Sequence, residues 1–337
     1  MIRRALKYLV YNVVCPALLF LSVDKFLSAM SRNKKLIVMY HGVRKGQQRI
    51  NGRHVTAEQF ERQLHYFSRH FTVVPLREIC EMKIHGIIPR RRTIALTFDD
   101  GFLNNITVAL PLLRKYGMPA TFFLCTAALE DVSYLHPSDL LDLIRVGGGM
   151  DGISVAGDRF VRQGHQLIGT ATGRNAYEQV SSLPLDRWHA VMKEMRKKFE
   201  VDKLTAEIDK ELFTLIDNAS IDQLAKDDLS GIGSHSHHHV DLTQLQDEEI
   251  FQELALSKKI LGAYMAKPVE SVAFPYGYYN ATVIRQARAL GFRYLIAGGD
   301  VPPEFSNEVF PRIGVLDGAG YGYTILSISW GFKRFGF

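Results

Sequence analysis

The chain has 337 residues, of which 47% are hydrophobic and 23% charged, an ordinary globular composition that suffices for one large core or two smaller ones. Its formal net charge of +6 comes from 41 basic and 35 acidic residues. A nucleic-acid binder would usually concentrate more positive charge among interleaved aromatic residues, so we expect no nucleic-acid partner. Cys15, Cys80 and Cys125 match no zinc or redox spacing, and we expect reduced or buried thiols.

Residues 1–30 form the first predicted element, a membrane-associating or anchor helix. Residues 5–23 are mostly apolar and follow Arg3 and Arg4, which suit an anionic membrane surface. Asn12 and Pro16 interrupt the run, so it is marginal as a bilayer span of ~20 apolar residues. An uncleaved signal anchor, a helix in the membrane interface and a soluble helix packed on the domain all stay open. We expect membrane association in a bacterial-type cell envelope, and the sequence does not identify the side.

From residue 36 onward, short apolar runs alternate with amphipathic helical patterns. The predicted strands span residues 36–40, 93–98, 120–124, 230–234, 271–274, 292–297 and 309–315. The predicted helices span residues 56–69, 104–116, 243–264 and 281–290, and the capping-box spacing of Thr243 and Gln246 supports the third. This alternation favours an α/β fold with a mostly parallel sheet, either a barrel or an open sheet.

Between residues 126 and 230 the strand–helix rhythm breaks. Helical patterns at 176–183, 187–200 and 205–216 indicate a largely helical insertion, folded over one face of a barrel-type domain that spans residues 31–337. Tyr134, His136 and Trp188 could contact a substrate from this insertion. They could equally belong to its core, which we favour for Trp188.

Asp99 and Asp100 directly follow a predicted buried strand and precede Gly101, which permits a sharp exit from the strand. Neighbouring side chains on an extended segment point to opposite sides, so one carboxylate can hold a metal while the other faces a substrate. A helix cap is the simpler interpretation of Asp-Asp-Gly taken alone.

A second polar cluster, Gly-Ser-His-Ser-His-His-His at residues 233–239, also follows a predicted strand. His235 and His239 are four residues apart, a spacing that can place two imidazoles within reach of one ion. His237 and His238 lie between them, and we expect them at the surface or behind the metal ligands. A solvated polyhistidine patch is the alternative, which the flanking strand and helix patterns weaken.

Two further motifs occupy strand ends. Phe-Pro-Tyr-Gly at residues 274–277 predicts a rigid turn that can aim the backbone N–H of Tyr276 into a cleft. His41 ends the first predicted strand, where a histidine is often only a satisfied polar group. In a barrel of parallel strands, chemistry gathers at the carboxyl ends, so all four motifs can meet there.

These motifs resemble those of the polysaccharide deacetylases, also called the NodB-homology family or carbohydrate esterase family four. Residues 97–101 match the first motif of the family, His235-Ser236-x-x-His239 the second, and residues 274–277 the third. The resemblance implies a distorted (β/α) barrel. It also implies Asp100, His235 and His239 as metal ligands, Asp99 as general base and the Tyr276 N–H at the oxyanion.

The sequence departs from the family in two places. An arginine that orients the base often begins the third motif and is missing here, so Arg312 is the substitute. The late Leu-x-His strand that supplies the general acid is also missing from the C-terminal end. Some members of the family resemble circular permutants with that strand at the N-terminus, and residues 37–41 resemble such a strand. His41 is therefore the candidate acid in a circularly permuted member.

The function that follows is metal-dependent hydrolysis of N-acetyl groups from a polysaccharide or lipid-linked saccharide, at an Asp-His-His site for which Zn²⁺ is the default ion. The expected partners are an N-acetylated glycan and, through residues 1–30, a membrane surface. An O-acetyl esterase would use the same ligands. A non-catalytic glycan-binding or membrane scaffold protein is a third interpretation, but it would not need all four of Asp99, Asp100, His235 and His239.

Overall fold

The apolar runs predicted as strands form a closed parallel barrel. The computed structural model describes residues 6, 8–30, 34–147, 153–155, 157–163, 166–317 and 320–330. In this part of the chain, seven strands pair in the order β1-β13-β12-β11-β10-β6-β5, and β5 pairs back to β1. The barrel form of the predicted α/β fold is thereby confirmed. Its strands are β1 (Lys35–Tyr40), β5 (Thr93–Phe98), β6 (Ala120–Leu124), β10 (Ser230–Ser234), β11 (Ser271–Ala273), β12 (Tyr294–Gly298) and β13 (Val309–Gly314).

Most of the barrel strands are largely apolar, because both of their faces are covered. Every residue of β5 and β6 is buried, as expected when one face fills the barrel and the other packs against helices. Thr97 of β5 is a polar exception inside this layer, and its hydroxyl donates to the carbonyl of Val38 at 3.0 Å. Three short strands flank the barrel: β2 (Gly42–Arg44), β3 (His54–Thr56) and β4 (Thr72–Val73).

Helices surround the barrel, and their ends follow local capping chemistry. Thr56 caps α4 by accepting the N–H of Gln59 at 3.1 Å, and the helix buries Phe60, Leu64 and Phe67. Gly117, with φ of 61°, ends the helix predicted from residue 104, as its position indicated. The helices are α4 (Ala57–His70), α5 (Leu76–Ile84), η2 (Asn105–Ala109) continuing into α6 (Leu110–Tyr116), α13 (Asp247–Tyr264), α14 (Ala281–Ala289) and α15 (Gly320–Trp330).

Two helix predictions are wrong in their bounds. Helix α13 begins at Asp247, because Gln246 and Glu249 form its capping box, whereas Thr243 lies in a separate turn, η4 (Leu242–Gln244). The helix predicted over residues 205–216 is instead the end of α11 (Val201–Glu207), followed by the turn η3 (Lys210–Leu212). Asp209 caps this turn by accepting the N–H of Glu211 at 3.1 Å.

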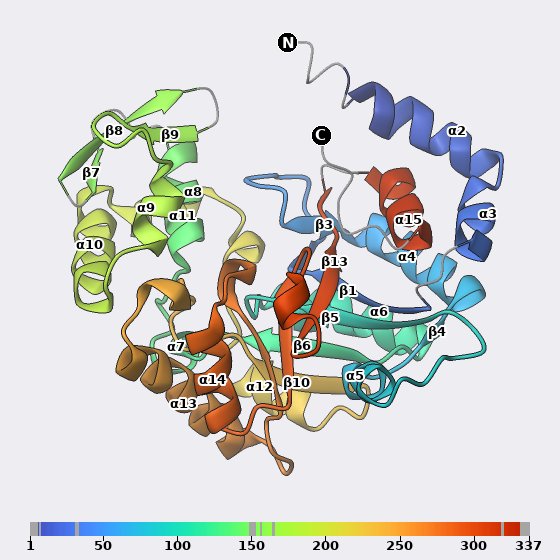
Figure 1. Cartoon of the computed structure of the whole chain (residues 1–337). Coiled ribbons are helices and arrows are strands. Elements are labelled where there is room, and N and C mark those ends of the chain that lie inside the picture. Colours follow the sequence, from blue (N-terminus) through green and yellow to red (C-terminus); the bar gives the residue numbers. More distant parts are fainter. Residues whose placement is uncertain are drawn as a thin grey trace.

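The segment between β6 and β10 is not wholly helical. It contains a three-stranded antiparallel sheet that the sequence did not indicate, beside the predicted helices (Figure 1). Its elements are α7 (Ala127–Glu130), α8 (Pro137–Val146), β7 (Ile153–Val155), β8 (Asp158–Gln163), β9 (Gln166–Gly169), α9 (Ala176–Ser181), α10 (Leu185–Lys198), α11, η3 and α12 (Asn218–Ala225). The division into an N-terminal unit, a barrel domain and an insertion at residues 126–230 stays a prediction.

The N-terminal apolar segment is a broken helix that lies beside the C-terminal one. Its pieces are η1 (Val10–Val14), α2 (Cys15–Phe20) and α3 (Val23–Met30). Helices α2 and α3 contact α15 on the side of the barrel away from β7–β9 (Figure 1). Among the described residues, no single helix is long and apolar enough to cross a membrane, although the pieces on either side of a 78° bend pass that test together. Arg3 and Arg4 lie outside the described residues.

Candidate active site

The four sequence motifs meet at the carboxyl ends of the barrel strands. Asp99 and Asp100 follow β5, His235 follows β10, Phe274 follows β11 and His41 follows β1. The β1–β5 register, in which Tyr40 lies opposite Phe98, continues with the Asp99 N–H donating to the carbonyl of Tyr40 at 2.9 Å. This end of the barrel is where parallel-strand barrels carry their chemistry.

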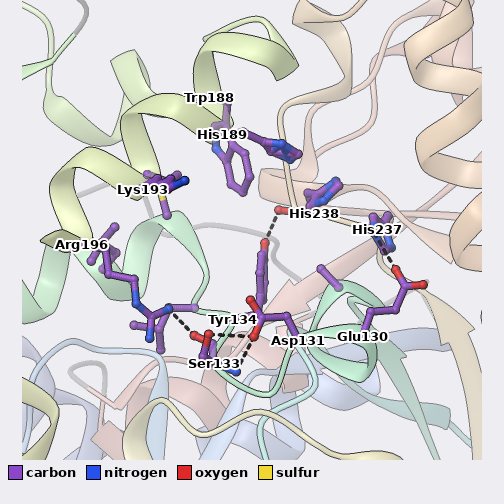
Figure 2. Close-up of a pocket in the computed structure, with 14 residues that line it drawn as sticks. Glu130, Asp131, Ser133, Tyr134, Trp188, His189, Lys193, Arg196, His237 and His238 are labelled. Carbon is purple, nitrogen blue, oxygen red and sulfur yellow. Dashed lines mark hydrogen bonds and ion pairs between the residues drawn. The ribbon is translucent and has the colours of Figure 1, made fainter. Parts of the chain in front are cut away.

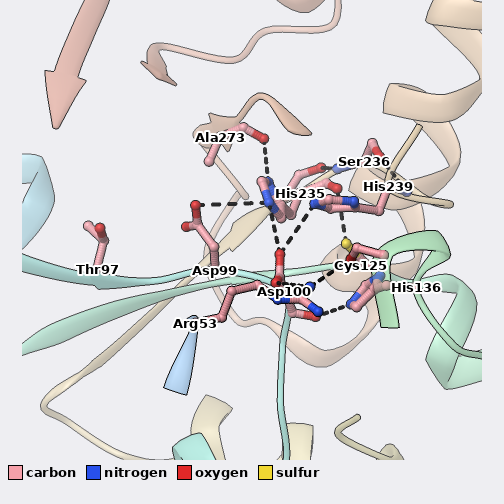
Figure 3. Close-up of polar contacts among 12 residues, drawn as sticks. Arg53, Thr97, Asp99, Asp100, Cys125, His136, His235, Ser236, His239 and Ala273 are labelled. Atoms are coloured by element: carbon pink, nitrogen blue, oxygen red, sulfur yellow. Dashed lines mark hydrogen bonds and ion pairs between the residues drawn. The ribbon is translucent and has the colours of Figure 1, made fainter. Parts of the chain in front are cut away.

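Asp100, His235 and His239 form a compact set of metal-ligand atoms (Figure 3). The Asp100 Oδ1 atom lies 3.5 Å from the Nε2 atom of His235 and 3.3 Å from the Nε2 atom of His239. Two ligand atoms ~2.1 Å from one ion at a tetrahedral angle lie roughly 3.4 Å apart, so these separations fit one shared cation. No other set of three such groups comes together among the residues that the structure describes.

The hydrogen bonds of His235 leave its ligand atom available. The Nδ1–H group of His235 donates to the carbonyl of Ala273 at 2.7 Å, which leaves the lone pair of Nε2 facing Asp100. The Nδ1 atom of His239 is buried and has no hydrogen-bond partner in the described part of the chain. The Nε2 atoms of both imidazoles face Asp100 and are the nitrogens placed for coordination.

The electrostatics of the set favour positive charge. Burial alone would lower the pKa of His235, but the Asp99 and Asp100 carboxylates outweigh burial and raise it. Burial alone would raise the pKa of Asp100, but contacts with His235 and His239 outweigh burial and hold it well below its usual range. A divalent cation could take the place of the proton that the carboxylates stabilise on His235, so the donor set fits a metal.

The backbone is strained where these groups converge. Asp100, Ser236, His239 and Tyr276 have φ values of 72°, 63°, 55° and 57°, and they are four of the six non-glycine residues with positive φ in the described chain. Such conformations cost of order 1–3 kcal/mol each and persist only where surrounding contacts impose them. They turn the side chains that follow β5, β10 and β11 toward one point.

Glu253 of α13 is one source of these contacts. One carboxylate oxygen of Glu253 accepts the N–H groups of His237 and His238 at 3.1 and 2.9 Å, and the other lies 2.6 Å from the Nδ1 atom of His238. His237 and His238 therefore lie behind the ligand loop, and His237 is buried rather than solvated. The solvated polyhistidine alternative is wrong for this residue.

Asp99 is held apart from the ligand set by Arg312. Both oxygens of Asp99 accept hydrogen bonds from the Arg312 guanidinium at 2.6 Å, and Arg312 is 1% exposed. Burial would raise the pKa of Asp99, but Arg312 outweighs it and lowers the pKa, so Asp99 rests as a carboxylate. The structure thus brings Arg312 from β13 to the carboxylate for which the sequence proposed it.

Tyr276 and His41 complete the predicted residues. The Tyr276 ring lies against His239, with ring centroids 4.6 Å apart. Gly277 makes this turn possible, because its φ is 74° and a Cβ atom there would lie 3.1 Å from the carbonyl of Gly298.

The Nδ1 atom of His41 is buried without a partner among the described residues. Burial lowers the pKa of His41, although the Asp100 and Asp99 carboxylates oppose that effect.

Sequence reasoning missed Arg53, which lies on the far side of Asp100. Its Nη1 atom is 3.8 Å from the Oδ2 atom of Asp100, and its Nη2 atom donates to Asp139 and, at 3.1 Å, to Asp142. Burial would lower the pKa of Arg53, but these carboxylates outweigh it and raise the pKa. Because α8 lies 86 residues from Arg53 along the chain, no local pattern could have indicated this contact.

His136 and Trp188 are both buried. The Nε2–H group of His136 donates to the backbone carbonyl of Asp100 at 2.9 Å, and His136 is fully buried. The alternative that His136 contacts the substrate is therefore wrong. Trp188 is 3% exposed, as we favoured.

Comparison with known proteins gives a family match and two curated relatives. A family model described as polysaccharide deacetylase matches residues 87–167 and 188–295. A protein of Bacillus subtilis, provisionally named a polysaccharide deacetylase, is 28% identical over 113 residues, which are 33% of this chain and 39% of that protein. The poly-beta-1,6-N-acetyl-D-glucosamine N-deacetylase of Staphylococcus epidermidis is 30% identical over 123 residues, which are 33% of this chain and 42% of that protein. The matches thus span less than half of either relative.

Two solved structures share the fold. The deacetylase PplD of Streptococcus pyogenes, solved with acetate, has a TM-score of 0.52 at 18% identity and matches 86% of this chain and 95% of its own. IcaB from Ammonifex degensii has a TM-score of 0.54 at 15% identity and matches 88% of this chain and 96% of its own. At these identities the similarity shows the fold alone.

Proposed function

We propose that this chain, which belongs to the polysaccharide deacetylase family, hydrolyses N-acetyl groups on a glycan with a divalent metal held by Asp100, His235 and His239. The observation that carries the proposal is the convergence of three ligand atoms within 4.8 Å of one another, beside an Asp99 carboxylate that Arg312 fixes. One carboxylate and two imidazoles make Zn²⁺ the first ion to test. When bound, such an ion supplies Lewis-acid polarisation of a carbonyl and makes water more acidic.

The chain's own groups supply the proton transfers. Asp99 is the general base, because Arg312 keeps it ionised and both of its oxygens are oriented. Arg312 is a positioning residue that acts through Asp99. The backbone N–H of Tyr276 is proposed to donate to the developing oxyanion, from a turn whose ring rests on His239.

His41 is proposed as the general acid toward the leaving amine. It follows β1, which lies between β13 and β5 in the barrel, so it comes from the same end of the barrel as Asp99 and Asp100. Burial favours the neutral form of His41, so it must take up a proton from solvent before it can pass one to the leaving amine. The nearby Asp99 and Asp100 carboxylates favour that gain.

We propose a glycan of N-acetylglucosamine type as the first substrate class, because the Staphylococcus epidermidis relative is named for such a polymer. The test incubates Zn²⁺-loaded protein with β-1,6-linked N-acetylglucosamine oligosaccharides and measures released acetate. A matched O-acetylated oligosaccharide without N-acetyl groups is assayed in parallel. Release from the N-acetylated compounds that a chelator abolishes supports the proposal. Release from the O-acetylated compound alone would assign an esterase, and no release from either would contradict both.

We also propose that residues 1–30 attach the chain to a membrane of a bacterial-type cell envelope, where a lipid-linked saccharide would be within reach. Large apolar side chains on the N-terminal helices support this, with Phe20 90%, Leu21 69% and Phe26 63% exposed. Exposed apolar patches on soluble monomers are usually small, so such a group marks a contact surface. A lipid surface suits side chains on a broken helix with few charges.

A further inference from the structure

A pocket of about 410 Å³ lies beside the metal-ligand set, between α10 and the chain that follows β6 (Figure 2). Its lining includes the apolar side chains of Leu135, Leu140 and Met192. The exposed charged side chains of the lining, such as Glu130, Asp131 and Lys193, form its rim. Neither its residues nor its position has a part in the chemistry proposed above. A mostly apolar pocket with a few convergent polar groups is the usual form of a small-molecule site.

Aromatic and imidazole rings gather on one side of this pocket. The His189 and His238 ring centroids are 4.6 Å apart, and those of Trp188 and His238 are 5.6 Å apart. The Nε1–H group of Trp188 is buried and finds no acceptor in the described part of the chain. A buried indole N–H usually has a partner, and leaving it unpaired costs free energy. A hydroxyl group entering the pocket could accept this hydrogen bond.

The charges on the rim nearly balance. Lys193 and Arg196 of α10 face Glu130 and Asp131 across the pocket (Figure 2). Glu130 lies 3.4 Å from the Nε2 atom of His237, and Arg196 donates to the carbonyl of Ser133. Two exposed carboxylates would repel a phosphate group, whereas neighbouring donors and acceptors suit a neutral ring with several hydroxyls.

Only one layer of rings separates the pocket from the metal-ligand set. The Tyr134 hydroxyl donates to the carbonyl of His238 at 2.5 Å. The Tyr134 ring is 5.7 Å from that of His136, which is 4.9 Å from that of His239, measured between centroids. His237 and His238 border the pocket, and His239 is the next residue of the same loop. A ligand in the pocket therefore lies close enough to belong to the molecule that reacts.

We propose that this pocket is a saccharide subsite, which holds a neutral sugar ring of the glycan away from the acetyl group being removed. The proposal rests on the proposed function for the identity of the glycan. The accessible rings of Tyr134, His189 and His238, beside donors and acceptors at the rim, match a pyranose, whose faces are apolar and whose edge carries hydroxyls. The subsite makes affinity depend on the length of the oligosaccharide.

The test uses Trp188 as a local reporter in protein that cannot turn over. The chain has two tryptophans, so the Trp330→Phe variant leaves Trp188 as the only one. After treatment with a chelator, this variant is titrated with β-1,6-linked N-acetylglucosamine oligosaccharides of increasing length, by fluorescence and by calorimetry. We expect saturable binding that tightens with length and changes the Trp188 emission.

Two further variants decide whether the binding occurs in the pocket. His189→Ala removes an exposed ring, so folding is not at risk, and binding should weaken about five-fold. Lys197→Ala changes an exposed residue of the same helix outside the pocket and should leave binding unchanged. Equal binding by His189→Ala and its parent, or a response to inorganic phosphate and not to sugar, would overturn the subsite. Acetate release without pocket binding would refute the subsite alone, and pocket binding without acetate release would refute only the deacetylase proposal.

Discussion

Asp99 and Asp100 show how two adjacent carboxylates acquire different surroundings. Asp99 keeps both oxygens on Arg312, whereas Asp100, with φ of 72°, turns one oxygen toward His235 and His239. Strand alternation alone does not account for this difference, because the positive φ of Asp100 takes it out of the extended conformation. The sequence pointed to Arg312 only because the third motif lacks the arginine that the family often has there. The contact itself leaves no local pattern, since Asp99 and Arg312 are 213 residues apart.

A lysine at position 312 tests whether the two-point contact matters for turnover. The Arg312→Lys variant keeps the positive charge but cannot hold both oxygens of Asp99. Losing one hydrogen bond to a charged group costs about 1.5–3 kcal/mol, so we expect kcat to fall about ten- to a hundred-fold. KM and bound metal should change little, because Arg312 contacts none of the three ligands. Steady-state kinetics with metal analysis of the same preparation measures this.

The matched control is Arg285→Lys, in which an exposed arginine pairs with exposed Asp247. Exposed ion pairs contribute little to folding stability, and this one lies outside the site, so kcat should stay at the wild-type value. If Arg312→Lys also keeps the wild-type kcat, or loses its metal, the positioning role of Arg312 is wrong.

Among the elements, the buried strands were predictable and the insertion was not. Strands β5, β6 and β10 have the predicted bounds. In β5 and β6 a largely apolar run has few alternatives once helices cover both faces. Strand β10, with the sequence Ser-Gly-Ile-Gly-Ser, is instead fixed by its pairing with β6 along its whole length. The sheet β7–β9 and the end of α11 were missed. Residues there alternate weakly, and tertiary contacts such as Asp158 accepting the N–H groups of Ala171 and Thr172 shape the chain instead.

The N-terminal helices and α15 were also only partly predictable. The apolar run of residues 5–23 indicated a helix, but not its bend or its contact with a helix from the other end of the chain. Arg92 joins the two by donating to Ser28 and to the carbonyl of Ile328, at 2.6 and 2.9 Å. Such contacts leave no signal in a local pattern.

A vesicle-flotation experiment tests the membrane proposal for these helices. The double variant Phe20→Glu, Leu21→Glu places two charges on the most exposed apolar part of α2 and its end. Each large apolar side chain contributes about 1.5–3 kcal/mol when buried, so binding to anionic phospholipid vesicles should fall more than ten-fold.

Val132→Glu is the control for that experiment, because Val132 is equally apolar and 90% exposed but lies in the segment after β6. It should float with vesicles as the wild type does. Flotation of the double variant at the wild-type level, or no flotation of the wild type, would reject membrane attachment through residues 1–30.

At the scale of the whole molecule, the barrel assembles one site from distant parts of the chain. β1, β5, β10, β11 and β13 each deliver a group at their carboxyl ends, and the parallel alternation made that gathering predictable. The support behind the site was not predictable. Arg53 with α8, and Glu253 with the ligand loop, are contacts between segments whose sequences carry no shared pattern.

The most direct test of the account is the metal content of wild type, Asp99→Asn and His239→Ala, measured with acetate release on the same samples. Wild type should hold one equivalent of Zn²⁺ and lose activity with it on chelation. Asp99→Asn should keep the metal while kcat falls about a hundred-fold or more, the usual contribution of a general base. His239→Ala should lose both. Full activity in Asp99→Asn, or wild-type activity that survives complete removal of the metal, would contradict the account.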